Sequence, residues 1–177
     1  YIEFIKYLAL DEKVRLNIEL NSSDSINDML ESKDVNMSNI ELYHHSTNDS
    51  WCRDYGPDFL INSVDQQKVV LDWEYNSWGE KYPPFDLDNN IPNKISSLLE
   101  IDSIQIPMVL EGGSFDINGE GVLLTTKSCL LNSNRNPHLS KQEIEDYLKK
   151  YLIQKEVIWL DEGIVGDDTD GHIDDVA

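Results

Sequence analysis

Runs in which apolar and polar residues alternate predict strands at intervals along the chain. Leu16, Ile18 and Leu20 are spaced two apart, which places their side chains on one face of a strand. Further stretches have a strand-like composition, and the sequence therefore predicts strands near residues 14–20, 40–44, 59–62, 69–75, 103–110 and 157–160.

Helical spacing occurs between these stretches. Residues 25–30 read as a short helix with Ser23 or Asp24 as its cap, and helical spacing also follows the Ile91-Pro92 pair. The clearest helix begins at Ser140, which forms a capping box with Glu143. The residues after this cap form one apolar stripe: Ile144, Tyr147, Leu148, Tyr151 and Leu152.

A hairpin completes the pattern, because residues 114–117 and 122–125 flank the turn sequence Asn118-Gly119-Glu120-Gly121. Strands and helices that alternate in this way predict an α/β or α+β fold of several small units. No linker separates two regions, so we expect residues 1–177 to form a single domain, and no repeat is evident in the sequence.

Composition and charge narrow the classes of function. The chain has 177 residues, 40% of them hydrophobic, and a net charge of −20. We therefore expect one globular unit that binds neither nucleic acid nor membrane, since both are anionic and no apolar run approaches the ~18 residues of a membrane span. A surface with this negative charge attracts small cations. The same charge is equally consistent with a surface that only keeps the protein soluble.

The two cysteines, Cys52 and Cys129, are too few for a disulfide framework and lack the paired spacing of a zinc site. The chain opens at Tyr1 and stops at Ala177, which suggests that both ends are cut. We expect a cytoplasmic protein, and the sequence leaves a secretion signal and homo-oligomerisation open.

Two acidic residues stand beside glycines. Asp54 precedes a Gly-Pro pair and a predicted strand, where loops often present functional groups, although a turn cap or an ion pair with Arg53 fits equally. Glu111 ends a predicted strand and precedes Gly112 and Gly113, which allow a ligand or backbone to approach closely. The simpler interpretation of Glu111 is a solvated side chain beside a glycine turn.

The third candidate is the acidic segment 166–175. It does not fit a calcium-binding loop, because aligning its Gly171 leaves Gly166 and Ala177 at ligand positions. A transition-metal site is the weaker alternative, since the segment has one histidine. His172 and Asp174 are two residues apart, so in an extended segment they lie on one side, where the carboxylate would poise the imidazole for proton transfer.

These clusters, in this order, resemble the agmatine deiminase family and the related bacterial-type peptidylarginine deiminases. The resemblance begins near Asp49 and covers most of the remaining chain. It rests on these sequence motifs: Trp51-x-Arg53-Asp54-x-Gly56-Pro57, Asp72-Trp73, Asn76-x-Trp78-Gly79, Tyr82-Pro83-Pro84, Leu110-Glu111-Gly112-Gly113-Ser114, Leu123-Leu124-Thr125-Thr126, Leu130-Leu131-Asn132, Asn134-Arg135-Asn136-Pro137 and residues 166–174.

The resemblance implies a partial pentein, a β/α-propeller built of ββαβ-like units, and chemistry without a cofactor or metal. It also implies hydrolysis of agmatine to N-carbamoylputrescine and ammonia through a covalent cysteine intermediate, in putrescine biosynthesis. A peptidylarginine deiminase-like enzyme and a non-catalytic guanidine- or polyamine-binding module remain alternatives. A small cationic guanidine is the expected partner.

The resemblance also implies a role for each candidate residue. Asp54 and Asp174 grip the guanidinium, and Glu111 makes a further contact to it. His172 acts as general acid and then as general base. Trp51 packs along the aliphatic part of the substrate, and Asp168 binds its distal amine. Neither Cys52 nor Cys129 matches the family's nucleophile, so we expect the 177 residues alone to be inactive.

Overall fold

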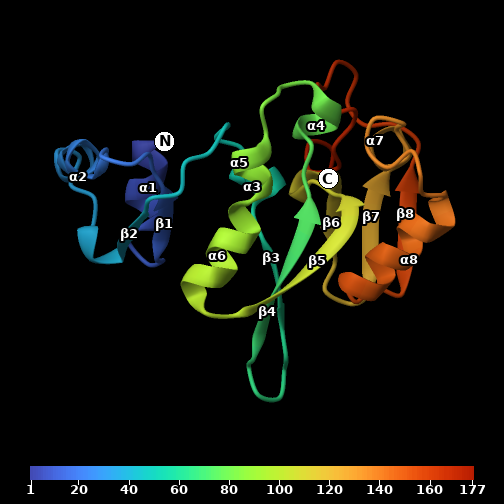
Figure 1. The fold of residues 1–177 in the computed structure, drawn as a ribbon, viewed down its shortest axis with the longest axis horizontal. Coiled ribbons are helices and arrows are strands. Elements are labelled where there is room, and N and C mark those ends of the chain that lie inside the picture. Colours follow the sequence, from blue (N-terminus) through green and yellow to red (C-terminus); the bar gives the residue numbers. More distant parts are fainter. The chain divides into compact units, whose positions relative to one another are not determined.

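The computed structural model describes residues 1–177, which form two compact units, Tyr1–Thr47 and Asn48–Ala177 (Figure 1). No helix in either unit combines the length and apolar composition that crossing a membrane requires. The prediction that all 177 residues form one domain stays a prediction.

The first unit is a βαβ element with an additional helix at its start. A parallel pair joins β1 (Val14–Asn17) to β2 (Ile40–Tyr43), and α2 (Ser23–Glu31) lies in the connection between them. Parallel strands need such a crossover connection, because a tight turn reverses the direction of the chain and can join only antiparallel strands. The apolar side chains of α1 (Ile2–Leu8) and α2 pack into a core that contains Ile5, Ala9, Leu30 and Val35.

The second unit begins with a three-stranded sheet of order β3-β4-β5. β3 (Asp58–Ile61) and β4 (Lys68–Glu74) form an antiparallel hairpin, and β5 (Asp102–Val109) runs parallel to β4. The crossover from β4 to β5 contains α6 (Ile91–Leu99), with the single-turn helices α4 (Ser77–Glu80) and α5 (Asp86–Asn89) before it. The sheet thus has a ββαβ connection.

A second sheet repeats this arrangement. The hairpin of β6 (Phe115–Ile117) and β7 (Val122–Thr126) is followed by α7 (Lys127–Leu130), α8 (Lys141–Tyr151) and then β8 (Glu156–Leu160), which runs parallel to β7. The structure therefore contains two ββαβ units in succession, although the sequence shows no repeat. The two ββαβ units have the same pattern of strand pairing and of buried faces, and different residues can form that pattern.

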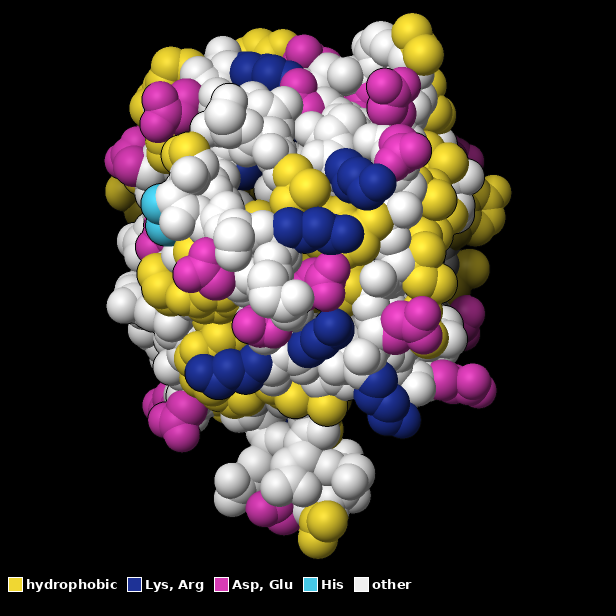
Figure 2. Space-filling view, turned by 90° about the vertical axis from the view of Figure 1, so that its right-hand side faces the viewer, with side chains coloured by type: hydrophobic (Ala, Val, Ile, Leu, Met, Phe, Trp, Pro, Cys, Tyr) yellow, Lys and Arg dark blue, Asp and Glu magenta, His cyan; other side chains and the backbone are white.

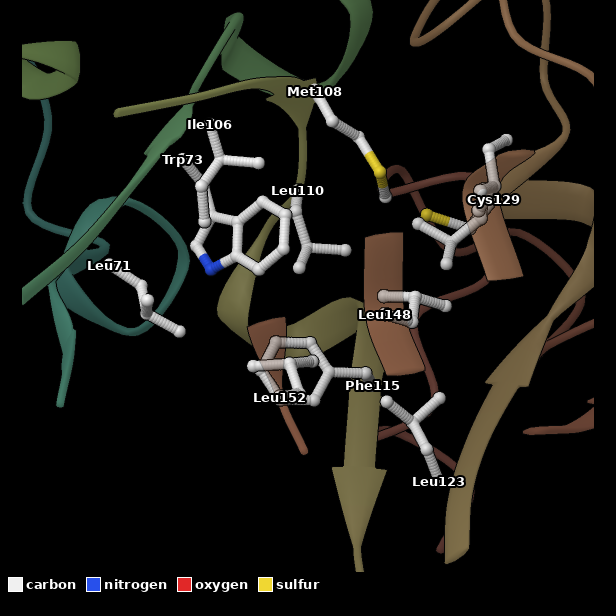
Figure 3. Packing of buried hydrophobic residues seen from close by; sticks show 12 residues of the cluster. Leu71, Trp73, Ile106, Met108, Leu110, Phe115, Leu123, Cys129, Leu148 and Leu152 are labelled. Atoms are coloured by element: carbon white, nitrogen blue, oxygen red, sulfur yellow. The ribbon is translucent and has the colours of Figure 1, made fainter. Parts of the chain in front are cut away.

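One hydrophobic core joins the two sheets of the second unit (Figure 3). Trp73 from β4 and Met108 from β5 meet Phe115 from β6 and Leu148 from α8 in this cluster. The sulfur of Cys129 points into the same cluster in Figure 3. Because residues from both sheets fill one core, the loops at the ends of their strands are held in fixed relative positions.

The predicted elements agree closely with the structure. Each predicted strand and helix is present, with boundaries that differ by a few residues; the first predicted strand, 14–20, is shortened to Val14–Asn17. The short helices α1, α3 (Cys52–Tyr55), α4, α5 and α7 were not predicted. α1 has seven residues and the others have four each, which are too few to show a periodic pattern.

Charge is mixed on the face turned toward the viewer in Figure 2, which lies on the side of α8 and β8 in Figure 1. Lysine and arginine side chains alternate there with acidic ones, and apolar side chains lie between them. Lys141 lies over the ring of Trp159 and Lys150 over that of Tyr151, at 4.9 and 4.5 Å from the ring centroids. The excess of negative charge, −20 for the chain, is therefore not spread evenly over the surface.

The capping box predicted for α8 is present and allows a first test of stability. The Ser140 hydroxyl accepts a hydrogen bond from the Glu143 amide, and the Glu143 carboxylate accepts one from the Ser140 amide at 2.7 Å. We expect Ser140→Ala to lower the free energy of unfolding by about 1 kcal/mol, since it removes the acceptor for a helix amide. Urea unfolding measures this, and an unchanged midpoint would contradict the role of the cap.

Candidate active site

A pocket of about 440 Å³ opens in the second unit where the loops after several strands meet. Its lining combines six carboxylates, three aromatic rings, one arginine, one threonine and one histidine: Asp49, Trp51, Arg53, Asp54, Trp78, Tyr82, Asp167, Asp168, Thr169, His172, Asp174 and Asp175. A pocket with this excess of negative charge and aromatic surface favours an organic cation.

Asp54 lies at the buried end of the pocket, on the single-turn helix α3, and its side chain is fixed by two donors. Its Oδ1 accepts a hydrogen bond from the Gly113 amide at 3.0 Å, and its Oδ2 accepts one from Trp78 Nε1 at 3.1 Å. Burial raises the pKa of Asp54 to about 6, although both hydrogen bonds act in the opposite direction. The carboxylate is therefore held in place but lacks a cationic partner of its own.

His172 presents one ring nitrogen to the pocket. Its Nδ1 lies 3.7 Å from Asp54 Oδ1 and 3.9 Å from Asp174 Oδ1. Burial, with a further contribution from the charge of Arg135, lowers the pKa of His172 to about 4. The imidazole is thus neutral near pH 7. The chain turns after His172, which corrects the expectation of an extended segment, yet His172 and Asp174 still face each other.

Asp174 is the more exposed of the two carboxylates beside His172, with 38% of its side chain accessible. Burial and the neighbouring Asp175 raise its pKa, and Arg53 acts against them with its Nε 4.0 Å from Asp174 Oδ2. Asp54 and Asp174 therefore approach the same histidine nitrogen from two different segments. A planar guanidinium has donors on several edges, which suits carboxylates placed in this way.

Glu111 does not line the pocket, because it is fully buried in the interior of the unit. Its Oε1 accepts a hydrogen bond from Arg135 Nε at 2.6 Å, in an ion pair with no solvent exposure on either side chain. Burial raises the pKa of Glu111, while Arg135 opposes this shift. Glu111 Oε2 and His172 Nε2 are both buried without a hydrogen-bond partner. The predicted contact of Glu111 with a substrate stays a prediction.

Glu111, Cys129 and His172 are also the set that comes nearest to a metal site. One ligand atom from each lies within 4.8 Å of the others, and all three residues are buried. A divalent cation there would face the Arg135 guanidinium 2.6 Å from Glu111. Burial also raises the pKa of the Cys129 thiol well above its ordinary value, which opposes the thiolate that a metal requires. The residues therefore do not fit a metal ion.

Gly113 stands where the functional side chains converge. A Cβ at this position would lie 2.5 Å from His172 Nδ1, 2.8 Å from Asp174 Oδ2 and 2.9 Å from Asp54 Oδ1. Its amide donates to Asp54, and its carbonyl accepts from the amides of Ile173 and Asp174. Gly113 therefore fixes the Asp54 carboxylate and the main chain of Asp174 through its backbone, while leaving the space between the two side chains free.

Gly112 has a different constraint. A Cβ there would lie 2.0 Å from the carbonyl oxygen of Arg53, so the second glycine lets the loop pack directly against α3. The sequence correctly indicated that this glycine pair permits close approach. It could not show that Gly113 approaches ligand-binding groups while Gly112 approaches backbone.

The loop 166–171 is organised by two of its own aspartates. Asp167 accepts hydrogen bonds from the amides of Thr169, Gly171 and His172 at 2.9 to 3.0 Å. Asp170 pairs with Lys81 at 2.9 Å and with Arg135 at 2.6 Å. Burial would raise the pKa of Asp170, but hydrogen bonds from Lys81, Asn134 and Arg135 hold it at about 2. These two acids thus hold the loop in place.

The structure places five of the six predicted site residues around the pocket, and Glu111 behind it. The exposed side chain of Trp51 lines the pocket, and so does Asp168, which lies on the loop 166–171. Three residues with clear roles were missed by the sequence analysis: Trp78, Tyr82 and Arg135. Each lies in a motif that carried the family resemblance, which was the available signal, but only the folded chain shows what their side chains contact.

Comparison with known proteins agrees with this geometry. The family model described as Porphyromonas-type peptidyl-arginine deiminase matches residues 1–177. A Legionella pneumophila protein provisionally named agmatine deiminase is 45% identical over the whole chain, which covers 49% of that protein. An agmatine deiminase of Pseudomonas syringae is 45% identical over 148 residues, which are 79% of this chain and 39% of that protein.

The fold agrees as well. A solved structure of Enterococcus faecalis agmatine deiminase matches 99% of this chain with a TM-score of 0.90 and 36% identity, and the match covers 47% of that structure. The expected partial pentein is thereby confirmed. The chain spans about half the length of the curated relatives with which it aligns fully. It is similar in sequence and structure to agmatine deiminases, and it belongs to the Porphyromonas-type peptidyl-arginine deiminase family.

Proposed function

We propose that the whole protein containing this chain hydrolyses the guanidinium of agmatine to N-carbamoylputrescine and ammonia. The observation that carries the proposal is the pocket itself, in which Asp54 and Asp174 flank the Nδ1 atom of a neutral, buried histidine. We propose further that residues 1–177 belong to one catalytic domain.

Binding is the first step. The guanidinium enters between Asp54 and Asp174, and its positive charge supplies the partner that the buried Asp54 lacks. Uncompensated burial of a carboxylate is costly, so the substrate cation stabilises the ionised form of Asp54. The planar cation is then held with its carbon directed toward the space that Gly113 leaves open. The aliphatic chain lies along the exposed ring of Trp51.

His172 transfers the protons of the reaction. The neutral His172 first accepts the proton of the attacking thiol. The thiolate then forms a C–S bond to the guanidinium carbon, and the C–N bond breaks as ammonia leaves with the proton that His172 returns. Water then attacks the thiouronium carbon and gives a proton to His172, and the thiolate departs as N-carbamoylputrescine forms. Because Nδ1 faces the pocket, Nε2 remains for Glu111, whose unpaired Oε2 would stabilise the imidazolium whenever His172 holds a transferred proton.

Neither cysteine of this chain has the setting of that nucleophile. Cys52 is exposed and absent from the pocket lining, and the buried Cys129 is held as a thiol by its raised pKa. A nucleophilic cysteine needs a lowered pKa and access to substrate. We therefore propose that the attacking sulfur comes from a part of the whole protein outside these 177 residues.

Ammonia release by the whole protein tests the function, with agmatine, free arginine and an arginine peptide compared at equal concentration. Release from agmatine alone supports the proposal, because Asp168 suits an amine and repels a carboxylate. Release from the peptide alone would assign a peptidylarginine deiminase activity. Guanidine binding without ammonia release from any of the three would indicate a binding module.

The pH dependence follows from the two shifted pKa values. Asp54 has a raised pKa of about 6, so its ionised form is lost as pH falls through 6, whereas His172 stays neutral down to about pH 4. We expect kcat/KM for agmatine to rise with pH through an apparent pKa near 6, and imidazole NMR signals of His172 to remain those of the neutral ring at pH 5. Protonation of His172 above pH 5.5 would contradict this assignment.

A further inference from the structure

One wall of the pocket is a continuous series of contacts from its buried end to its mouth. Asp54 accepts the hydrogen bond from Trp78 Nε1 at 3.1 Å, and the Trp78 ring meets that of Tyr82 edge-on, with centroids 6.0 Å apart and planes at 79°. The Tyr82 hydroxyl donates to Oδ2 of Asp168. All four side chains line the same pocket, so the wall connects two carboxylates that a substrate can reach.

The two ends of this wall differ in their surroundings. Asp54 and Trp78 are 7% and 6% exposed, while Tyr82 is 53% exposed and Asp168 lies on the surface. An exposed carboxylate contributes little to binding a cation when its side chain is free to rotate, because ordering it costs entropy and water screens its charge. The hydrogen bond from Tyr82 removes that freedom at Asp168.

The remaining contacts of the loop leave the Asp168 carboxylate available. Lys81 Nζ donates to the main-chain carbonyl of Asp168 at 2.5 Å and pairs with the side chain of Asp170 at 2.9 Å. Arg135 also pairs with Asp170. Both cations that approach this loop from outside are thus directed to Asp170, and the negative charge of Asp168 faces the pocket with the Tyr82 hydroxyl as its partner.

From this arrangement we propose that Tyr82 is a specificity-determining residue. It holds the Asp168 carboxylate at a set distance from Asp54, so that the pocket selects guanidines with a terminal ammonium group at the far end of a short aliphatic chain. The inference rests on the proposed function and names how that site selects its substrate class. Tyr82 acts through Asp168 on one end of the substrate and not on the reacting carbon.

The test compares agmatine with n-butylguanidine, which has the same butyl chain but lacks the amine, in the whole protein and its Tyr82→Phe variant. This variant removes the hydroxyl and keeps the ring against Trp78. We expect KM for agmatine to rise about five- to tenfold with kcat unchanged, since an ordered hydrogen bond to a charged group is lost. Both constants for n-butylguanidine stay the same. Tyr147→Phe on α8 serves as the matched control and leaves both substrates unaffected.

Other outcomes overturn the inference. Equal changes in KM for both substrates would show that Tyr82 only maintains the pocket, and no change with agmatine would show that it has no role in selection. In the Asp168→Ala background, Tyr82→Phe must have no further effect on agmatine, because the acceptor of the Tyr82 hydroxyl is already removed.

Calorimetric binding of the two ligands separates this inference from the proposed function. If the unaltered protein releases no ammonia from agmatine, the proposed function fails. The inference about Tyr82 then stands only if the Phe variant still weakens binding of agmatine and not of n-butylguanidine.

Discussion

Asp54→Asn is expected to lower kcat/KM for agmatine about 100- to 1000-fold, which corresponds to roughly 3–4 kcal/mol for leaving a buried charge unpaired. In the substituted protein the buried end of the pocket no longer carries the negative charge that compensates the guanidinium. The neutral amide also offers one oxygen, where the carboxylate accepts from both the Gly113 amide and Trp78 Nε1. Ammonia release and calorimetric binding measure the loss.

Asp146→Asn on α8 is the matched control, because it makes the same change in charge at an exposed residue outside the pocket. We expect it to leave kcat/KM unchanged. Circular dichroism should show that both variants are folded. If the Asp54 variant binds agmatine as tightly as the unaltered protein, the guanidinium does not bind between Asp54 and Asp174, and the proposed site is wrong.

Gly113→Ala is expected to reduce activity at least as strongly while leaving the fold intact. The added methyl group would lie 2.5 Å from His172 Nδ1 and within 3 Å of Asp54 and Asp174, so these side chains must move away from the reacting carbon. A displacement of about 1 Å at a catalytic group can cost roughly 100-fold in rate. The steady-state rate with agmatine and the thermal unfolding midpoint are the two measurements.

Gly119→Ala gives the opposite result and is the control. Gly119 has a φ of +74° in the β6–β7 hairpin, and a Cβ there has no neighbour within 4 Å. The substitution should destabilise the protein by about 1 kcal/mol through backbone strain and leave the rate unchanged. A Gly113 variant that keeps full activity would show that the pocket has room beyond what the structure indicates.

The strands and longer helices could be predicted from the sequence because their determinants are local. The strand-like composition around Val69–Val70 and the cap at Ser140 each specify an element from residues that are adjacent or one turn apart. The candidates Asp54, His172 and Asp174 were also found, since each stands beside glycines or acids in a recognisable segment. These segments, together with the other motifs between Trp51 and Asp174, indicated the family.

Interactions between distant segments were beyond the reach of the sequence. For Asp54 the sequence suggested, as local alternatives to a functional role, a turn cap or an ion pair with Arg53. In the structure its carboxylate accepts hydrogen bonds from Gly113 and Trp78, which are 59 and 24 residues away. Arg135 had no predicted role, although it pairs with Glu111 and Asp170. These partners become neighbours only when the two ββαβ units share one core.

The sequence by itself determined which elements form, which family the chain belongs to and which acids and histidine carry the candidate chemistry. The tertiary structure alone decided that burial lowers the pKa of His172, that Glu111 lies behind the pocket with Arg135, and that Tyr82 donates a hydrogen bond to Asp168. The physical reason is that pKa values and side-chain orientation depend on burial and on charges brought close in space. Residues distant along the chain create both.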